Sequence, residues 1–311
     1  MFELKNLVVL AFFIIPTIHY SQHTDQINSN RPGETMSAYA VGKSVIQLES
    51  GFYGINEKHS VGNWEANGYG LDLTVRWGLF LERLELIADL QYQYETFNPT
   101  IIYPDRSALK QTVFGAKYLI YDPFKNYEKK INVYSWKANH SFNWHQLKPA
   151  ISVFAGTNLT FPDNPYAFYN QPSFSPKVML ITQNHLGDGS WVFITNIIGD
   201  YIGTDYPSYN YVLTLTKGFN DHWSGFIENQ GIKSDFYSDA IVRGGAAFLI
   251  NNNMQIDASI SNSLKNTPSI LYGGIGFSWR YNANYKKIRM NINSGNSAKK
   301  ANKRAKKTKK G

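Results

Sequence analysis

NGYGLDLTVRW, residues 67–77, alternates apolar side chains with glycine and polar side chains without a break. Successive residues of a β-strand point to opposite faces, so one face of this segment is apolar and the other is polar. The apolar face carries Tyr69, Leu71, Leu73, Val75 and Trp77. The pattern predicts a strand that borders an apolar phase on one side and a polar phase on the other.

The segment that follows, RLELIADLQYQYE at residues 83–95, repeats this alternation. Both segments are longer than the roughly 5–6 residues of an average soluble strand. They match the roughly 9–11 residues that a tilted strand needs to cross a bilayer. Length therefore favours a membrane barrel over a soluble sandwich.

Further alternating segments, separated by turn signals such as Asn251-Asn252, bring the total to about twelve strands, and an even number is expected of a bacterial single-chain barrel. The fold class predicted is all-β, a transmembrane antiparallel up-and-down β-barrel over residues 44–281. The other strands expected are 44–52, 110–121, 147–159, 175–184, 191–199, 209–217, 223–231, 240–250, 253–262 and 270–281.

The N-terminus, residues 1–22, is typical of a signal peptide. Lys5 precedes an apolar run of about a dozen residues, 7–18, which is too short to span a bilayer as a helix. The alternative is a membrane anchor or a buried strand. Ser21 could precede the cleavage site, with Gln22 as the new N-terminus. We expect the chain to be exported and to reside in the bacterial outer membrane.

The net charge of +8 comes from the C-terminal tail, residues 282–311, which holds 11 Lys or Arg and no acid. Removing those 11 cations from +8 leaves −3 for the rest of the chain. Two interpretations of the tail stay open: contact with anionic periplasmic or membrane surfaces, or a solvated disordered segment. Nucleic acid is not an expected partner of an exported protein. Between signal peptide and barrel, residues 23–43 are expected to form a periplasmic segment.

Charged residues on the polar faces of the strands must point inward, because on the lipid face each would cost several kcal/mol near the midplane. They could line a selective pore, or they could form an internal salt-bridge network that fills the lumen. The nine candidates for lumen-lining charges are Asp72, Arg76, Glu85, Asp89, Lys117, Glu228, Arg243, Asp257 and Arg280.

The sequence carries no catalytic or metal-binding motif, so no cofactor and no enzymatic activity are expected. The absence of cysteine excludes disulfides, thiolate metal sites and cysteine nucleophiles. His140 and His145 have a spacing that places them on opposite faces of any strand, and a loop contact is the simpler interpretation.

The stretch NRPGETMSAYAVGKSVIQLESGF at residues 30–52 resembles the start of a known barrel family. Similar pieces follow in the same order: RWGLFLERLELIADLQY at 76–92, GAKYLIYDPFKN at 115–126 and GGIGFSWRY at 273–281. The family is the outer-membrane transporter family also called phenol-degradation meta-pathway proteins. The chain departs from it at Gly33, where an acidic residue is common, and in the basic tail after Tyr281.

The resemblance implies an outer-membrane channel that passes small solutes, hydrophobic or aromatic ones among them, by passive diffusion. Its expected partners are outer-membrane lipid and a small-molecule solute. The first alternative is a structural or surface-interaction barrel with a filled lumen. The second is a barrel enzyme, whose catalytic groups would come from separate strands.

Overall fold

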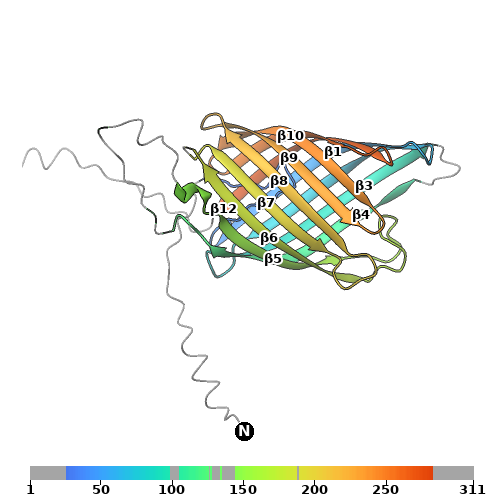
Figure 1. The fold of residues 1–311 in the computed structure, drawn as a ribbon, viewed down its shortest axis with the longest axis horizontal. Helices are drawn as coiled ribbons and strands as arrows, with labels where there is room; N and C mark the ends of the chain where they lie inside the picture. Colours follow the sequence, from blue (N-terminus) through green and yellow to red (C-terminus); the bar gives the residue numbers. More distant parts are fainter. Residues whose placement is uncertain are drawn as a thin grey trace, which may run out of the picture.

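The computed structural model describes residues 26–98, 105–125, 127, 134, 144–187 and 189–282. Within these residues, antiparallel strands form a closed barrel in which each strand pairs with its sequence neighbours and the first pairs with the last (Figure 1). The strands are β1 Val45–His59, β2 Trp64–Trp77, β3 Leu84–Asn98, β4 Arg106–Tyr121, β5 Ala150–Leu159, β6 Phe174–Leu186, β7 Trp191–Asp200, β8 Ser208–Gly218, β9 Trp223–Ser234, β10 Ser238–Asn251, β11 Met254–Ser263 and β12 Ser269–Asn282.

The outer face of the barrel is apolar, and the charged side chains of the strands point inward, beside one cluster of buried apolar residues that includes Ile87, Phe154 and Ile181. On β1, the inward Gln47 and Glu49 are each 1% exposed, whereas the outward Phe52 is 50% exposed. On β2, Arg76 is fully buried while Leu71 is 52% exposed. An apolar outer surface requires lipid around it, so the strand pattern and the burial together describe a membrane barrel.

The predicted fold class and strand count are confirmed: the described part of the chain has twelve antiparallel strands, each at a predicted position. Several strands extend further than expected. The first was expected to end at Phe52, but β1 continues to His59 because its inward positions, Ile55 and Glu57, stay buried. Outside the part of the barrel that faces lipid, the outward side chains need not be apolar. The alternation of apolar and polar residues that marks the strand therefore fades there.

The start of β1 and the end of β12 lie at one end of the barrel, which we call the terminal rim. Strands β6 and β7, β8 and β9, and β10 and β11 are joined there by turns of a few residues. Strands β4 and β5 are joined at the same rim by the connection 122–149, which includes the short 3₁₀ helix η1, Trp144–Leu147. The terminal rim therefore does not carry short turns alone.

Residues 26–44 enter the barrel from the terminal rim and run through its interior, as their bonds to inward side chains show. We call this segment the N-terminal plug. Its position differs from the periplasmic one expected for residues 23–43. The expected signal peptide, 1–22, and all but the first residue of the expected tail, 282–311, lie outside the described residues. In the described part of the chain, no helix has the length and apolarity needed to cross a membrane.

Candidate functional site

The lumen is built around the N-terminal plug, and every strand of the barrel contributes at least one side chain that contacts it. These side chains are Gln47, Arg76, Glu85, Lys117, Ser152, Gln183, Asn196, Thr214, Glu228, Arg243, Gln255 and Ser278, in strand order. Thr214 reaches the plug through Thr35 and Ser278 through Ser29. The plug is therefore an integral part of the fold.

Most of these bonds are made to the backbone of the plug. The Lys117 ammonium donates to the carbonyl oxygens of Ser37 at 2.8 Å and Tyr39 at 3.1 Å. The Asn196 amide accepts from the Met36 N–H at 2.6 Å and donates to the Met36 carbonyl at 3.0 Å. An irregular segment has no ladder to satisfy its N–H and C=O groups, so inward polar side chains must supply the partners.

Arg31 lies in a cradle formed by one register row of four adjacent strands. The row runs Asp72 on β2, Gly51 on β1, Gly276 on β12 and Asp257 on β11. The guanidinium is 3.4 Å from each carboxylate. A Cβ on either glycine would overlap the guanidinium, so a side chain at either position would displace Arg31 from the cradle.

Glu228, on β9, binds the plug at Glu34 and Thr35. Its carboxylate accepts the Glu34 N–H at 3.1 Å and the hydroxyls of Thr35 and Thr214, each at 2.8 Å. Arg243, opposite Glu228 in register, donates to the same carboxylate and lies 3.4 Å from the Glu34 side chain. A Cβ at Gly33 would lie 2.5 Å from Glu228 Oε2, so a larger residue there would displace this carboxylate.

All nine charges expected on the inner face point into the barrel. Arg76 bonds Glu85 at 2.7 Å and Glu49 at 3.0 Å, and Lys117 lies 3.3 Å from Glu85. These bonded pairs form the internal salt-bridge network that was one of the two predictions from the sequence. A role in selecting solutes stays a prediction. Other contacts of the nine join Asp72 and Asp257 to Arg31, Glu228 to Arg243, Asp89 to Thr74 and Gln111, and Arg280 to Asn253 and the Gln26 carbonyl.

Several site residues were not singled out from the sequence. Glu49 and Gln47 occupy the inward parity of β1 and could have been found by the rule that found the other nine. Arg31 lies in a segment without periodicity, so only its place in the Arg-Pro motif marked it.

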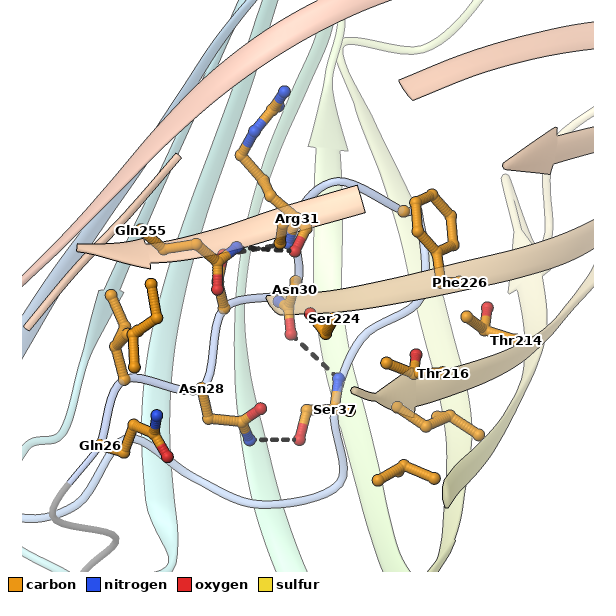
Figure 2. A pocket seen from close by; sticks show the side chains of 18 of the residues that line it. Gln26, Asn28, Asn30, Arg31, Ser37, Thr214, Thr216, Ser224, Phe226 and Gln255 are labelled. Carbon is orange, nitrogen blue, oxygen red and sulfur yellow. Dashed lines mark hydrogen bonds between the residues drawn. The ribbon is translucent and has the colours of Figure 1, made fainter. Parts of the chain in front are cut away.

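Two cavities lie on opposite sides of the plug. The larger has a volume of about 760 Å³ and is lined by the plug and by strands β6 to β11 near the terminal rim. Figure 2 shows part of its lining, with Asn28, Asn30 and Ser37 of the plug and Phe226 of β9. The smaller, of about 110 Å³, lies against β1 to β4. Asn30, Arg31 and Gly33 line both cavities. We call residues 30–34 the plug tip. Three of its residues, Asn30, Arg31 and Gly33, form the wall between the two cavities.

Tyr39 lies at the edge of the larger cavity. Its ring centroid is 5.8 Å from that of His185, which in turn makes an edge contact with Phe124. Burial and the carboxylate of Asp122 raise the pKa of the Tyr39 phenol above its usual value, so this hydroxyl stays neutral over the physiological range. The group adds aromatic surface to the cavity without adding charge.

The described residues hold no group of three or more His, Cys, Asp or Glu side chains arranged to bind a metal ion. His145 lies in η1, where its Nε2 is 2.8 Å from the Pro123 carbonyl oxygen. This is the loop contact expected from the sequence. His140 is outside the described residues.

Comparisons with known proteins agree with this architecture. The family model described as "Putative MetA-pathway of phenol degradation" matches residues 29–281. An outer-membrane channel from Pseudomonas putida F1 is similar over 82% of this chain and all of its own, with 11% identity and a TM-score of 0.51. The monoaromatic hydrocarbon channel CymD, at 8% identity, has a TM-score of 0.43 over 78% of this chain and 90% of its own. No curated protein matches the sequence.

Proposed function

The chain belongs to the family described as "Putative MetA-pathway of phenol degradation", and from this premise we propose that it is a passive channel whose path is closed by the plug tip. The barrel fold and the family fit a passive solute channel of the outer membrane. The solutes would be small, and hydrophobic or aromatic ones are among the candidates. The start of β1 and the end of β12 both lie at the terminal rim, which in this proposal faces the periplasm.

The observation that carries the proposal is the shared wall between the two cavities. Asn30, Arg31 and Gly33 are the residues that line both. Movement of the tip by a few ångströms would join the spaces without opening the barrel itself. The tip is held by Arg31 in its cradle and by Glu228, so these contacts would set how often the path is open.

Two pairs of hydroxyl groups allow the plug to be locked. Ser29 Oγ and Ser278 Oγ are 2.8 Å apart, and Thr35 contacts Thr214 in the same way. Replacing either pair with cysteine should give a disulfide on each side of the tip, since side-chain atoms this close suit disulfide geometry. The natural chain has no cysteine, so no other thiol interferes.

The test is single-channel conductance of S29C/S278C and T35C/T214C in planar bilayers, before and after reduction. We expect the oxidised proteins to be closed and dithiothreitol to restore the conductance of the natural chain. The matched control is N56C/N67C, which joins β1 to β2 at paired positions and leaves the plug free. Equal conductance of the oxidised and reduced locked variants would contradict a gate at the tip.

A structural barrel with a filled lumen is the second candidate, and the contacts from all twelve strands to the plug favour it. The same recordings separate the two. A chain that never conducts, reduced or oxidised, would be a sealed barrel. We propose no catalytic role: the members of this site pair with each other and with plug backbone, and none is arranged as a nucleophile and its base.

We also propose that residues 1–22 direct export and that the tail, 282–311, contacts anionic surfaces at the terminal rim. Both rest on the sequence. N-terminal sequencing of the mature protein tests the first, and binding of a tail-deleted chain to anionic vesicles tests the second.

A further inference from the structure

The two cavities beside the plug tip differ in size, but carboxylates line both of them. We propose that the path through these cavities selects cations over anions, so that among charged solutes small cations pass and anions are excluded. This inference rests on the proposed channel function and adds to it the charge of the solute. The sign of the lining charges does not act on a neutral solute, so neutral solutes are compatible with the same path.

Acidic side chains outnumber basic ones along the lining. Among the described residues, Arg31 is the one lysine or arginine that lines either cavity, and it lines both. The lining acids are Glu34, Glu49, Asp72 and Asp89 in the smaller cavity and Asp122 and Asp221 in the larger one. Two histidines, His185 and His222, also line the larger cavity. Histidine carries no charge well above its usual titration range, so at mildly alkaline pH the lining is acidic on both sides of the plug tip.

The ion pairs around the plug tip leave part of this negative charge uncompensated. In the cradle, one guanidinium, that of Arg31, faces two carboxylates at 3.4 Å each. The Arg243 guanidinium is likewise shared between two carboxylates, those of Glu228 and Glu34. Each of these groups joins one positive charge to two negative charges and therefore carries one excess negative charge.

Asp89 supplies a further uncompensated charge in the smaller cavity. Its two oxygens accept hydrogen bonds from the Thr74 hydroxyl and the Gln111 amide, each at 2.9 Å. Both donors are neutral, and no ion pair of the described residues includes this carboxylate. The hydrogen bonds orient the carboxylate and leave its charge in place.

The other cations beside the plug are withdrawn from the cavities. Arg76 and Lys117 are fully buried and are balanced by Glu49 and Glu85. Arg280 is 3% exposed and donates to a backbone carbonyl of the plug. None of these three cations lines either cavity. A solute in the path therefore meets carboxylates at the surface, whereas these cations are buried behind it.

Excess charge of one sign has a large effect in such a space. A narrow lumen with walls of low dielectric constant concentrates the field of its lining charges. That field raises the local concentration of ions of opposite sign and lowers that of ions of the same sign. Rings of Asp and Glu side chains select cations in other channels by this effect. The uncompensated carboxylates near the plug tip should therefore favour K⁺ over Cl⁻.

The measurement is the reversal potential of single channels in planar bilayers under a KCl gradient, which gives the permeability ratio of K⁺ to Cl⁻. Recordings at about pH 8 keep the lining carboxylates ionised and the histidines neutral. We expect a ratio of at least about threefold for the natural chain at low salt, and a smaller one at about 1 M KCl, where the charges are screened. A smaller low-salt ratio, or a preference for Cl⁻, would overturn the inference and keep the channel. A chain that never conducts would overturn the channel and the inference together.

Asp89→Asn removes one lining charge and keeps a side chain of the same shape. Asp89 bonds to strand side chains and not to the plug, so the gate should be unaffected. The permeability ratio should fall by about twofold or more. The matched control is Glu65→Gln, which removes the same charge from the outer surface, where Glu65 pairs with Lys58 at 3.3 Å. This control should leave the ratio unchanged.

Asp221→Asn provides a second variant in case D89N does not fold. Asp221 is exposed in the turn between β8 and β9, so its replacement leaves the barrel intact. The ratio should fall in D221N as well, by less than in D89N, because water around an exposed carboxylate screens its charge. A ratio that is the same in the natural chain, in E65Q and in every folded lumen variant would overturn the assignment of selectivity to these carboxylates.

Discussion

Replacement of Arg31 with methionine should release the plug tip and raise the fraction of time that the channel is open. Methionine keeps an unbranched, flexible side chain but removes the guanidinium. Asp257, whose side chain is fully buried, then loses the cation that now lies 3.4 Å away. Asp72, 27% exposed, loses the same partner at the same distance.

The magnitude follows from the burial of this pair. Removing one partner of a buried ion pair typically costs about 3–5 kcal/mol, because the other charge is left uncompensated. The contacts to Arg31 are long and one carboxylate is partly hydrated, so we take the lower end, about 3 kcal/mol. This cost applies to the closed state alone, since opening lets water reach Asp257. A difference of about 3 kcal/mol corresponds to roughly a hundredfold change in the ratio of open to closed channels.

The assay is single-channel recording of R31M beside the natural chain, with K58M as control. Lys58 pairs with Glu65 at 3.3 Å, but the two side chains are 62% and 40% exposed, so its loss leaves no buried charge. K58M should conduct as the natural chain does. An R31M protein that is folded by the gel-shift criterion, yet has an open fraction within about twofold of the natural chain, would refute the reasoning.

Three further predictions concern the same architecture. Gly51→Leu should open the channel as R31M does, because the new side chain occupies the space of the guanidinium; recordings in which G51L stays closed would count against the cradle. Glu228→Gln should lower barrel stability by about 3 kcal/mol or more, because Arg243 and three hydrogen-bond donors lose the carboxylate they contact. The measurement is the temperature of the gel-mobility shift, and an unchanged temperature would show that the plug contributes little to stability. Leu71→Lys should cost about 2–4 kcal/mol in denaturant unfolding from lipid vesicles, whereas Ser60→Lys at a turn should cost little, and equal effects would contradict the assigned lipid face.

The barrel could be predicted from sequence because its signal is local. Leu71 and Asp72 are neighbours, and period two alone places one toward lipid and the other toward the lumen. The same rule placed Arg76, Glu85 and Lys117 inside without any knowledge of their partners. It failed at the end of β1, where Asn56 and Glu57 lie past the region in which the outer face must be apolar.

The plug could not be predicted in this way because its interactions are long-range. Arg31 has no periodic neighbours, and its partners, Asp72 and Asp257, are remote in sequence and meet only when the barrel closes. Inward charges of both signs made an internal network one of the two predictions, but the sequence could not show that residues 26–44 take part in it. The glycines of the cradle are equally ambiguous, since Gly276 reads as strand curvature until the guanidinium beside it is seen.

Disulfide formation by S29C/S278C in the native outer membrane tests the central claim, that the N-terminal plug fills the lumen, without reference to conductance. The two hydroxyl oxygens are 2.8 Å apart although the residues are 249 positions apart in sequence. Non-reducing gels of denatured protein should show nearly complete cross-linking for this pair and for T35C/T214C, and none for S29C/S50C, since Ser50 lies on the outer face. An absence of cross-links in both plug pairs would show that residues 26–44 lie outside the barrel and would contradict the account.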